Sequence, residues 1–94
     1  GNISDTLTRC YLRVSVVDQP GVLAQISKIF AEHDISIAAV IQKESRAKDF
    51  VPIVITTHSA LERNLHLAIK EVDKLSVVKA KTQVIRILDT EVKA

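Results

Sequence analysis

The spacing of apolar residues changes along this chain in a fixed order, and that order constrains the fold more than any other feature. Period two is typical of half-buried strands, and a period near 3.6 is typical of amphipathic helices. Period two covers residues 10–16, 35–43, 51–57 and 77–88, and helical spacing covers residues 22–33 and 59–74. The sequence therefore predicts the element order β-α-β-β-α-β.

Such a chain has two β-α-β halves, and each half must cross over right-handed. Both helices then lie on one face of a four-stranded antiparallel sheet with strand order 4-1-3-2, an α+β ferredoxin-like sandwich. Two details are also predicted. Ser59 and Glu62 match a capping box that would start the second helix. In the last strand the alternation changes phase between Val84 and Ile85, which predicts a bulge or two short pieces.

The length of 94 residues allows one domain. We expect residues 1–8 to form a flexible leader, residues 9–88 to form the domain, and residues 89–94 to be a frayed tail. The segment 44–49 is charged and lacks glycine, which favours a flexible connection over a tight hairpin turn.

Composition excludes several classes of protein. Thirteen Lys and Arg stand against eleven Asp and Glu, and a net charge of +2 gives no reason to expect a nucleic-acid or membrane surface. The single cysteine, Cys10, cannot form an internal disulfide, and with three histidines it does not make a structural zinc site. The longest apolar run, residues 37–41, is too short to span a bilayer. We expect a soluble, cytoplasmic protein without metal or cofactor.

The residues that could carry catalysis do not converge in this fold. His33 ends the first helix, His58 lies in a connection, and His66 is on the solvent side of the second helix. Cys10 is in phase with Leu12 on the first strand, which indicates a small core residue rather than a nucleophile. The sequence predicts no catalytic site.

Three activities known for this architecture fail on the residues they need. An RNA-recognition domain stacks bases on aromatic residues of its central strands, and Tyr11 stands alone there. A copper chaperone needs Cys-x-x-Cys in the first connection, where this chain has Asp-Gln-Pro-Gly at 18–21. An acylphosphatase-like enzyme would need an arginine in the same loop, and Arg13 lies mid-strand.

The first loop is the strongest candidate for a binding site. A helix that opens after Gly21 presents the amides of Gly21, Val22 and Leu23 and the positive end of its dipole, which suit a carboxylate. Asp18 lies close by and could hold an ammonium group, so the loop could bind an amino-acid zwitterion. Alternatively, Asp18 merely caps the helix through the same amides. Spacing alone leaves both interpretations open.

The sequence Asp-Gln-Pro-Gly-Val-Leu-Ala at 18–24, with Glu-His-Asp-Ile-Ser-Ile-Ala at 32–38, resembles the ACT domain, a small regulatory module of amino-acid metabolism. The resemblance spans about residues 9–88. Residues 35–44, 51–58 and 60–63 more narrowly resemble the C-terminal ACT domain of homoserine dehydrogenases.

This resemblance implies an amino-acid effector, with threonine expected, that feedback-inhibits the catalytic portion of an NAD(P)-dependent parent enzyme. It implies that Asp18 holds the effector ammonium, that Gly21, Val22 and Leu23 hold its carboxylate, and that Ser36 of a neighbouring subunit completes the site. Many amino-acid-binding relatives carry an amide at the Ser36 position. The catalytic portion is not in this chain, since no Gly-x-Gly-x-x-Gly follows any strand.

The alternative is an assembly module that pairs subunits and binds no effector. The second strand is an edge of the predicted sheet, and its apolar, uncharged sequence indicates that a partner covers it. Two such edges could join into one eight-stranded sheet in a homodimer. The predicted interface residues are Ile35, Ile37, Ala38, Val40 and Ile41.

Overall fold

The structure, a computed structural model, describes residues 6–42 and 50–88. The start of the predicted leader, the predicted connection at 44–49 and the predicted tail lie outside the described residues. The elements in chain order are β1 (Leu7–Val17), α1 (Val22–Glu32), β2 (Ile37–Gln42), β3 (Phe50–Thr57), β4 (Ala60–Leu61), α2 (Glu62–Asp73) and β5 (Gln83–Leu88). β1 thus begins two residues before the predicted start of the domain.

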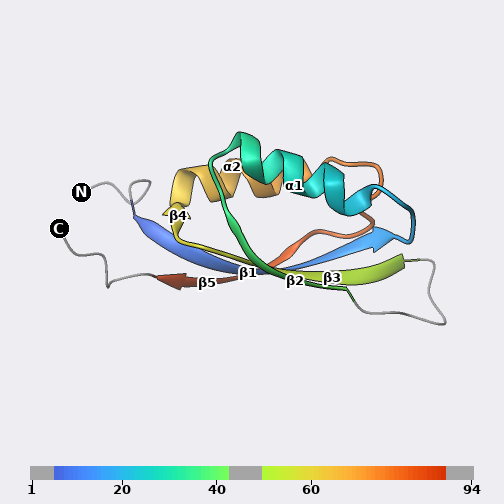
Figure 1. The fold of residues 1–94 in the computed structure, drawn as a ribbon, viewed down its shortest axis with the longest axis horizontal. Helices are drawn as coiled ribbons and strands as arrows, with labels where there is room; N and C mark the ends of the chain where they lie inside the picture. Colours follow the sequence, from blue (N-terminus) through green and yellow to red (C-terminus); the bar gives the residue numbers. More distant parts are fainter. Residues whose placement is uncertain (1–5, 43–49, 89–94) are drawn as a thin grey trace.

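β1 lies in the centre of an antiparallel sheet. It pairs with β3 on one side and with β5 on the other, and β2 lies outside β3. Thr8 pairs with Leu88 of β5 on one side and with Ala60 of the two-residue strand β4 on the other. β4 therefore lies on the same side of β1 as β3. The long strands therefore run β2-β3-β1-β5, which confirms the predicted order 4-1-3-2 with β5 as the fourth strand. Both helices cover one face of the sheet (Figure 1), as the ferredoxin-like prediction requires.

The core lies between this face and the helices. Alternate residues of β1 are buried there, from Cys10 to Val16, and they face the helical stripes that the periodicity predicted. The largest fully buried side chains are Phe30, Leu12, Ile26, Ile53, Ile55 and Leu65. Burial of these apolar groups stabilises the two-layer fold and fixes where each connecting loop must lie.

The alternation of β2 is interrupted by a bulge. Its register against β3 shifts between Ile37 and Ala39. After the bulge Val40 lies opposite the core residue Ile55, whereas Ile41 is exposed on the other face. The prediction that Ile37 and Ile41 share one face was therefore wrong, because the extra residue at the bulge reverses the alternation.

The second helix does not start at the predicted N-cap. α2 begins at Glu62, and its N-cap is Leu61 rather than Ser59. The Glu62 amide instead donates to the Thr6 carbonyl at 2.9 Å, and the Glu62 carboxylate accepts from Arg86 Nε at 2.8 Å. Distant segments thus bind both Glu62 groups that the predicted capping box would use.

The C-terminal segment consists of two pieces, as predicted. Val78 makes an isolated bridge to Val16, and β5 follows after a gap in which Thr82 donates to the Asp73 carboxylate. The predicted change of phase is absent, however, because β5 pairs with β1 in unbroken register. Ile85 and Ile87 are consequently on the sheet face opposite the helices, where they are exposed.

Candidate functional site

The loop between β1 and α1 starts from a firmly held strand end. The Val17 amide donates to the Val77 carbonyl at 2.9 Å, and the Lys79 amide donates to the Ser15 carbonyl at 2.8 Å. Within the loop the Gln19 amide turns back to the Val17 carbonyl at 3.0 Å. These hydrogen bonds fix the position of the end of β1, and the loop then places Gly21 at the start of α1.

Gly21 is the N-cap of α1 and has φ of 86°, in the left-handed region that favours glycine. A Cβ on Gly21 would meet no atom within 4 Å. The requirement for glycine in this chain is therefore conformational rather than steric, and the approach to the helix end is open.

The N-terminus of α1 is available for a ligand. No side chain caps it, and its first turn holds no acidic residue. The first intrahelical bond runs from the Gln25 amide to the Gly21 carbonyl at 3.1 Å, so the amides of Val22, Leu23 and Ala24 have no acceptor within the helix. Ala24 was not predicted, although counting three residues from the helix start at Val22 would have found it.

Asp18 lies exposed ahead of this helix end. The interpretation in which Asp18 caps α1 is not observed, since the helix has no side-chain cap. The predicted residues Asp18, Gly21, Val22 and Leu23 are thus brought together in one loop, with an exposed carboxylate and uncapped amides. The loop thus offers a carboxylate to the ammonium group of a zwitterion and amide donors to its carboxylate.

Ser36 lies far from this loop within one chain. It precedes β2, is exposed, and its carbonyl accepts from the His58 amide at 2.9 Å. It follows the C-terminal end of α1, whereas Gly21 is at the N-terminal end, and an 11-residue helix is roughly 16 Å long. Ser36 and Asp18 of the same chain cannot both contact one small amino acid.

The first loop is exposed in the single chain, from Asp18 to Gly21. A hollow of about 420 Å³ lies between α1 and the C-terminal end of α2, and another of about 470 Å³ lies between α2 and β5. Neither includes any residue from Asp18 to Leu23. A ligand at this loop would need a second surface to cover it.

β2 is an outer strand of the described sheet, and the predicted interface residues divide into two groups along it. The side chains of Ala38 and Ile41 are exposed. Ile37 and Val40 are partly buried against the core, and Ile35 is buried within it. The side chain of Ile35 thus packs in the core of its own chain, whereas Ala38 and Ile41 are accessible to a partner.

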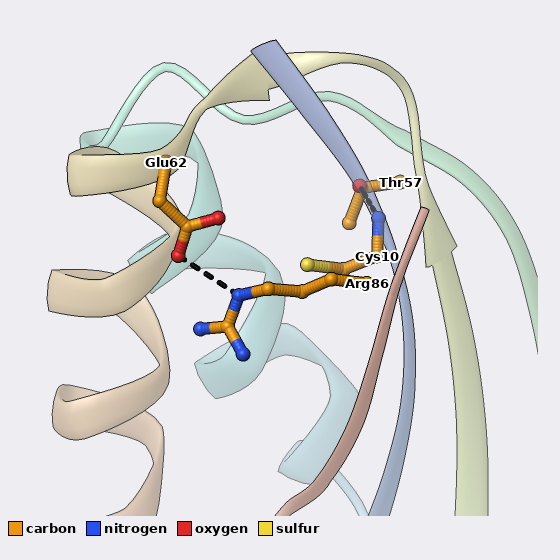
Figure 2. A network of polar contacts seen from close by, with 4 residues as sticks. All are labelled: Cys10, Thr57, Glu62 and Arg86. Carbon is orange, nitrogen blue, oxygen red and sulfur yellow. Dashed lines mark hydrogen bonds and ion pairs between the residues drawn. The ribbon is translucent and has the colours of Figure 1, made fainter. Parts of the chain in front are cut away.

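Cys10 belongs to a structural cluster rather than a reactive site. Figure 2 shows its thiol beside the Arg86 side chain, which extends from β5 to Glu62 at the start of α2. The Cys10 amide donates to Thr57 Oγ1 at 3.0 Å, and the residue is 2% exposed. Burial raises the pKa of the thiol to about 11, against a smaller opposing effect of the Arg86 charge. A protonated, buried thiol is a poor nucleophile.

The histidines do not form a catalytic group. Nε2 of His33 lies 2.7 Å from Oε2 of Glu71, which ties the end of α1 to α2. His58 is in the connection after β3 and His66 is exposed on α2. Across residues 6–42 and 50–88 no cluster of side chains could hold a metal ion, and no helix could cross a membrane.

The sequence matches the model of the ACT domain over residues 11–77. It is 38% identical over 85 residues to the homoserine dehydrogenase of Methylobacillus glycogenes, covering 89% of this chain and 21% of that protein. It is 40% identical over 76 residues to the homoserine dehydrogenase of Neisseria gonorrhoeae, covering 81% of this chain and 18% of that protein. The chain spans about a fifth of the length of these curated relatives.

Solved structures agree with this match. A homoserine dehydrogenase from Thiobacillus denitrificans superposes with a TM-score of 0.82 and 37% identity, over 95% of this chain and 19% of that one. The regulatory subunit of aspartate kinase from Thermus thermophilus, at 17% identity and a TM-score of 0.62, covers 87% of this chain and 52% of that one, and shares the fold. The first loop, the sheet order and these matches lead to one conclusion: the chain belongs to the ACT domain family.

Proposed function

We propose that this chain is the amino-acid-sensing regulatory domain of a homoserine dehydrogenase and that its effector is threonine. The observation that carries the proposal is the uncapped N-terminus of α1, with the exposed carboxylate of Asp18 in the loop before it. The effector carboxylate would accept from the amides of Val22 and Leu23, and its ammonium group would pair with Asp18. The relatives named homoserine dehydrogenase support the parent activity.

Two copies of the chain would complete the site. β2 runs from Ile37, opposite Thr57, to Gln42, opposite Ile53, and so ends toward the side of the sheet where β1 reaches Asp18. An antiparallel β2–β2 pairing about a two-fold axis brings the start of one β2 beside the end of the other. It therefore carries Ser36 of one copy toward the sheet end that holds Asp18 of its neighbour.

Such a shared site provides a means of regulation. An effector held by Asp18 of one copy and Ser36 of the other binds only when the two copies are in one arrangement. Binding therefore stabilises that arrangement, and an attached catalytic portion would respond to it. The domain itself does no chemistry in this proposal.

The second candidate is an effector-free dimerisation module, which the accessible edge of β2 favours. Calorimetric titration with a panel of amino acids separates the two candidates. We expect threonine to release or absorb heat and to raise the melting temperature, with alanine and lysine as inactive controls. The absence of both effects at millimolar threonine, with a dimer present by light scattering, would leave the assembly module as the function.

A further inference from the structure

The sheet face opposite the helices, which we call the open face, carries an unusual set of apolar side chains. Six large apolar side chains of the described residues are exposed, and five of them project from the strands: Tyr11, Ile41, Phe50, Ile85 and Ile87. Each of these five residues is next in sequence to a strand residue that faces the helices. Because side chains alternate along a strand, the five point to the open face. The sixth, Leu67, lies on α2.

The densest part of this set is where β1 and β5 meet. Tyr11 is directly opposite Ile85, and Ile87 is opposite Arg9 in the same ladder. Their exposed fractions are 43%, 62% and 55% for Tyr11, Ile85 and Ile87. A sheet with one solvated face normally carries polar residues there, and contiguous apolar groups on such a face mark an interaction surface.

The charges on this face restrict the partner. Arg9 and Arg13 flank Tyr11 along β1 and project from the same side. Among the described strand residues that point to the open face, none is Asp or Glu. A second copy packed face to face about a two-fold axis near Tyr11 would bring four arginines together without a carboxylate, which is unfavourable in a desolvated contact.

We infer that the open face, centred on Tyr11, Ile85 and Ile87, docks against a carboxylate-bearing apolar surface on the catalytic portion of the same dehydrogenase. This inference rests on the proposed function, because it needs a parent enzyme. The relatives are about five times as long as this chain, so most of their surface lies outside it. The edge of β2 remains free for the second copy, and the two contacts do not compete.

Side-chain footprinting with hydroxyl radicals tests this directly. The labelling of Tyr11, Ile85 and Ile87 is compared between the isolated 94-residue chain and the full-length dehydrogenase that carries it. We expect labelling of these three residues to fall at least fivefold in the full-length enzyme, while exposed Leu67 on α2 serves as the internal control and stays unchanged. Equal labelling in both proteins would overturn the inference.

Two further results keep the partner identifiable. If the three residues are already protected in the isolated chain, and Ile85→Lys both restores the labelling of Tyr11 and Ile87 and lowers the mass by sedimentation, the partner is a second copy and the inference is wrong. In the full-length enzyme, Arg13→Glu should increase Tyr11 labelling, and Lys28→Glu on α1 should not. Inhibition of the full-length enzyme by threonine is measured in a separate assay. If threonine does not inhibit the enzyme while Tyr11, Ile85 and Ile87 are protected from labelling, the proposed function is contradicted and the docking of the open face is not.

Discussion

At the scale of single residues, Gly21 determines both the path of the first loop and the uncapped state of the helix end that follows it. Gly21 adopts a left-handed backbone that allows the sharp entry into α1, and it leaves the helix end without a side-chain cap. Relative to a capping side chain, glycine at an N-cap costs only a few tenths of a kcal/mol. Leaving the helix end uncapped is therefore a small loss of stability, and it keeps the amides open to a ligand.

Asp18→Ala distinguishes binding from capping. Because Asp18 does not cap α1, we expect the free energy of unfolding to change by less than about 0.5 kcal/mol, as for an ordinary surface substitution. Threonine affinity should fall by roughly 10-fold to 100-fold, from loss of a charge-assisted hydrogen bond. Urea denaturation and calorimetry measure the two quantities. If the free energy of unfolding falls and the threonine affinity is unchanged, Asp18 has a structural role and does not bind the effector.

Gly21→Ala should destabilise the chain through its backbone. An alanine fits the open space but not the φ of 86°, and the left-handed conformation costs it about 1–2 kcal/mol. Gly21→Asn is the matched control, because asparagine tolerates this region better and should lose less. Equal stability of wild type and Gly21→Ala in urea would show that the loop readily adopts another conformation.

The Cys10 thiol should be unreactive in the folded chain and should make stability fall at alkaline pH. Its folded pKa of about 11 lies above its ordinary value near 9, so the unfolded chain loses its proton first. The contribution is fully present below pH 9 and is lost as the pH rises from 9 toward 11, by up to about 2–3 kcal/mol. Cys10→Ala should show a shallower decline over this range. Identical declines would exclude this cause.

At the scale of elements, local patterns predicted the helices, the order of the strands and the core face of β1. The bulge in β2 and the open-face residues of β5 were missed for one physical reason. Both strands carry apolar residues on both faces, so the sequence of Ile85 and Ile87 cannot indicate which side is buried. The start of α2 was missed because Thr6 and Arg86, distant in sequence, take the groups that a local cap would use.

The edge of β2 gives a prediction about assembly. Ala39 is exposed and lies near the middle of β2, so a two-fold pairing of two β2 strands brings both copies of this residue close together. Ala39→Lys should therefore place like charges opposite each other across the interface and raise the dimer dissociation constant by roughly tenfold or more. Sedimentation equilibrium measures this, with Leu67→Lys on α2 as the control. A dimer unaffected by Ala39→Lys would require another interface.

At the scale of the whole molecule, the candidate site could be predicted only in part. The loop residues are contiguous in sequence, and their chemistry follows from the helix end that they form. The relation of Ser36 to Asp18 could not follow from the residues themselves, because an entire helix separates the two in one chain. The proposed site exists only between copies, and the sheet order explains how one pairing could form it.

The proposal that the effector binds between two copies is tested most directly by mixing Asp18→Ala with Ser36→Ala. Each variant alone has both sites of its dimer damaged, whereas a mixed dimer has one intact site and one site with both substitutions. After unfolding and refolding together, titration with threonine should recover about one quarter of the wild-type number of sites at wild-type affinity, because random pairing makes about half of the dimers mixed. No recovery, with mixed dimers verified by mass spectrometry, would contradict a shared site.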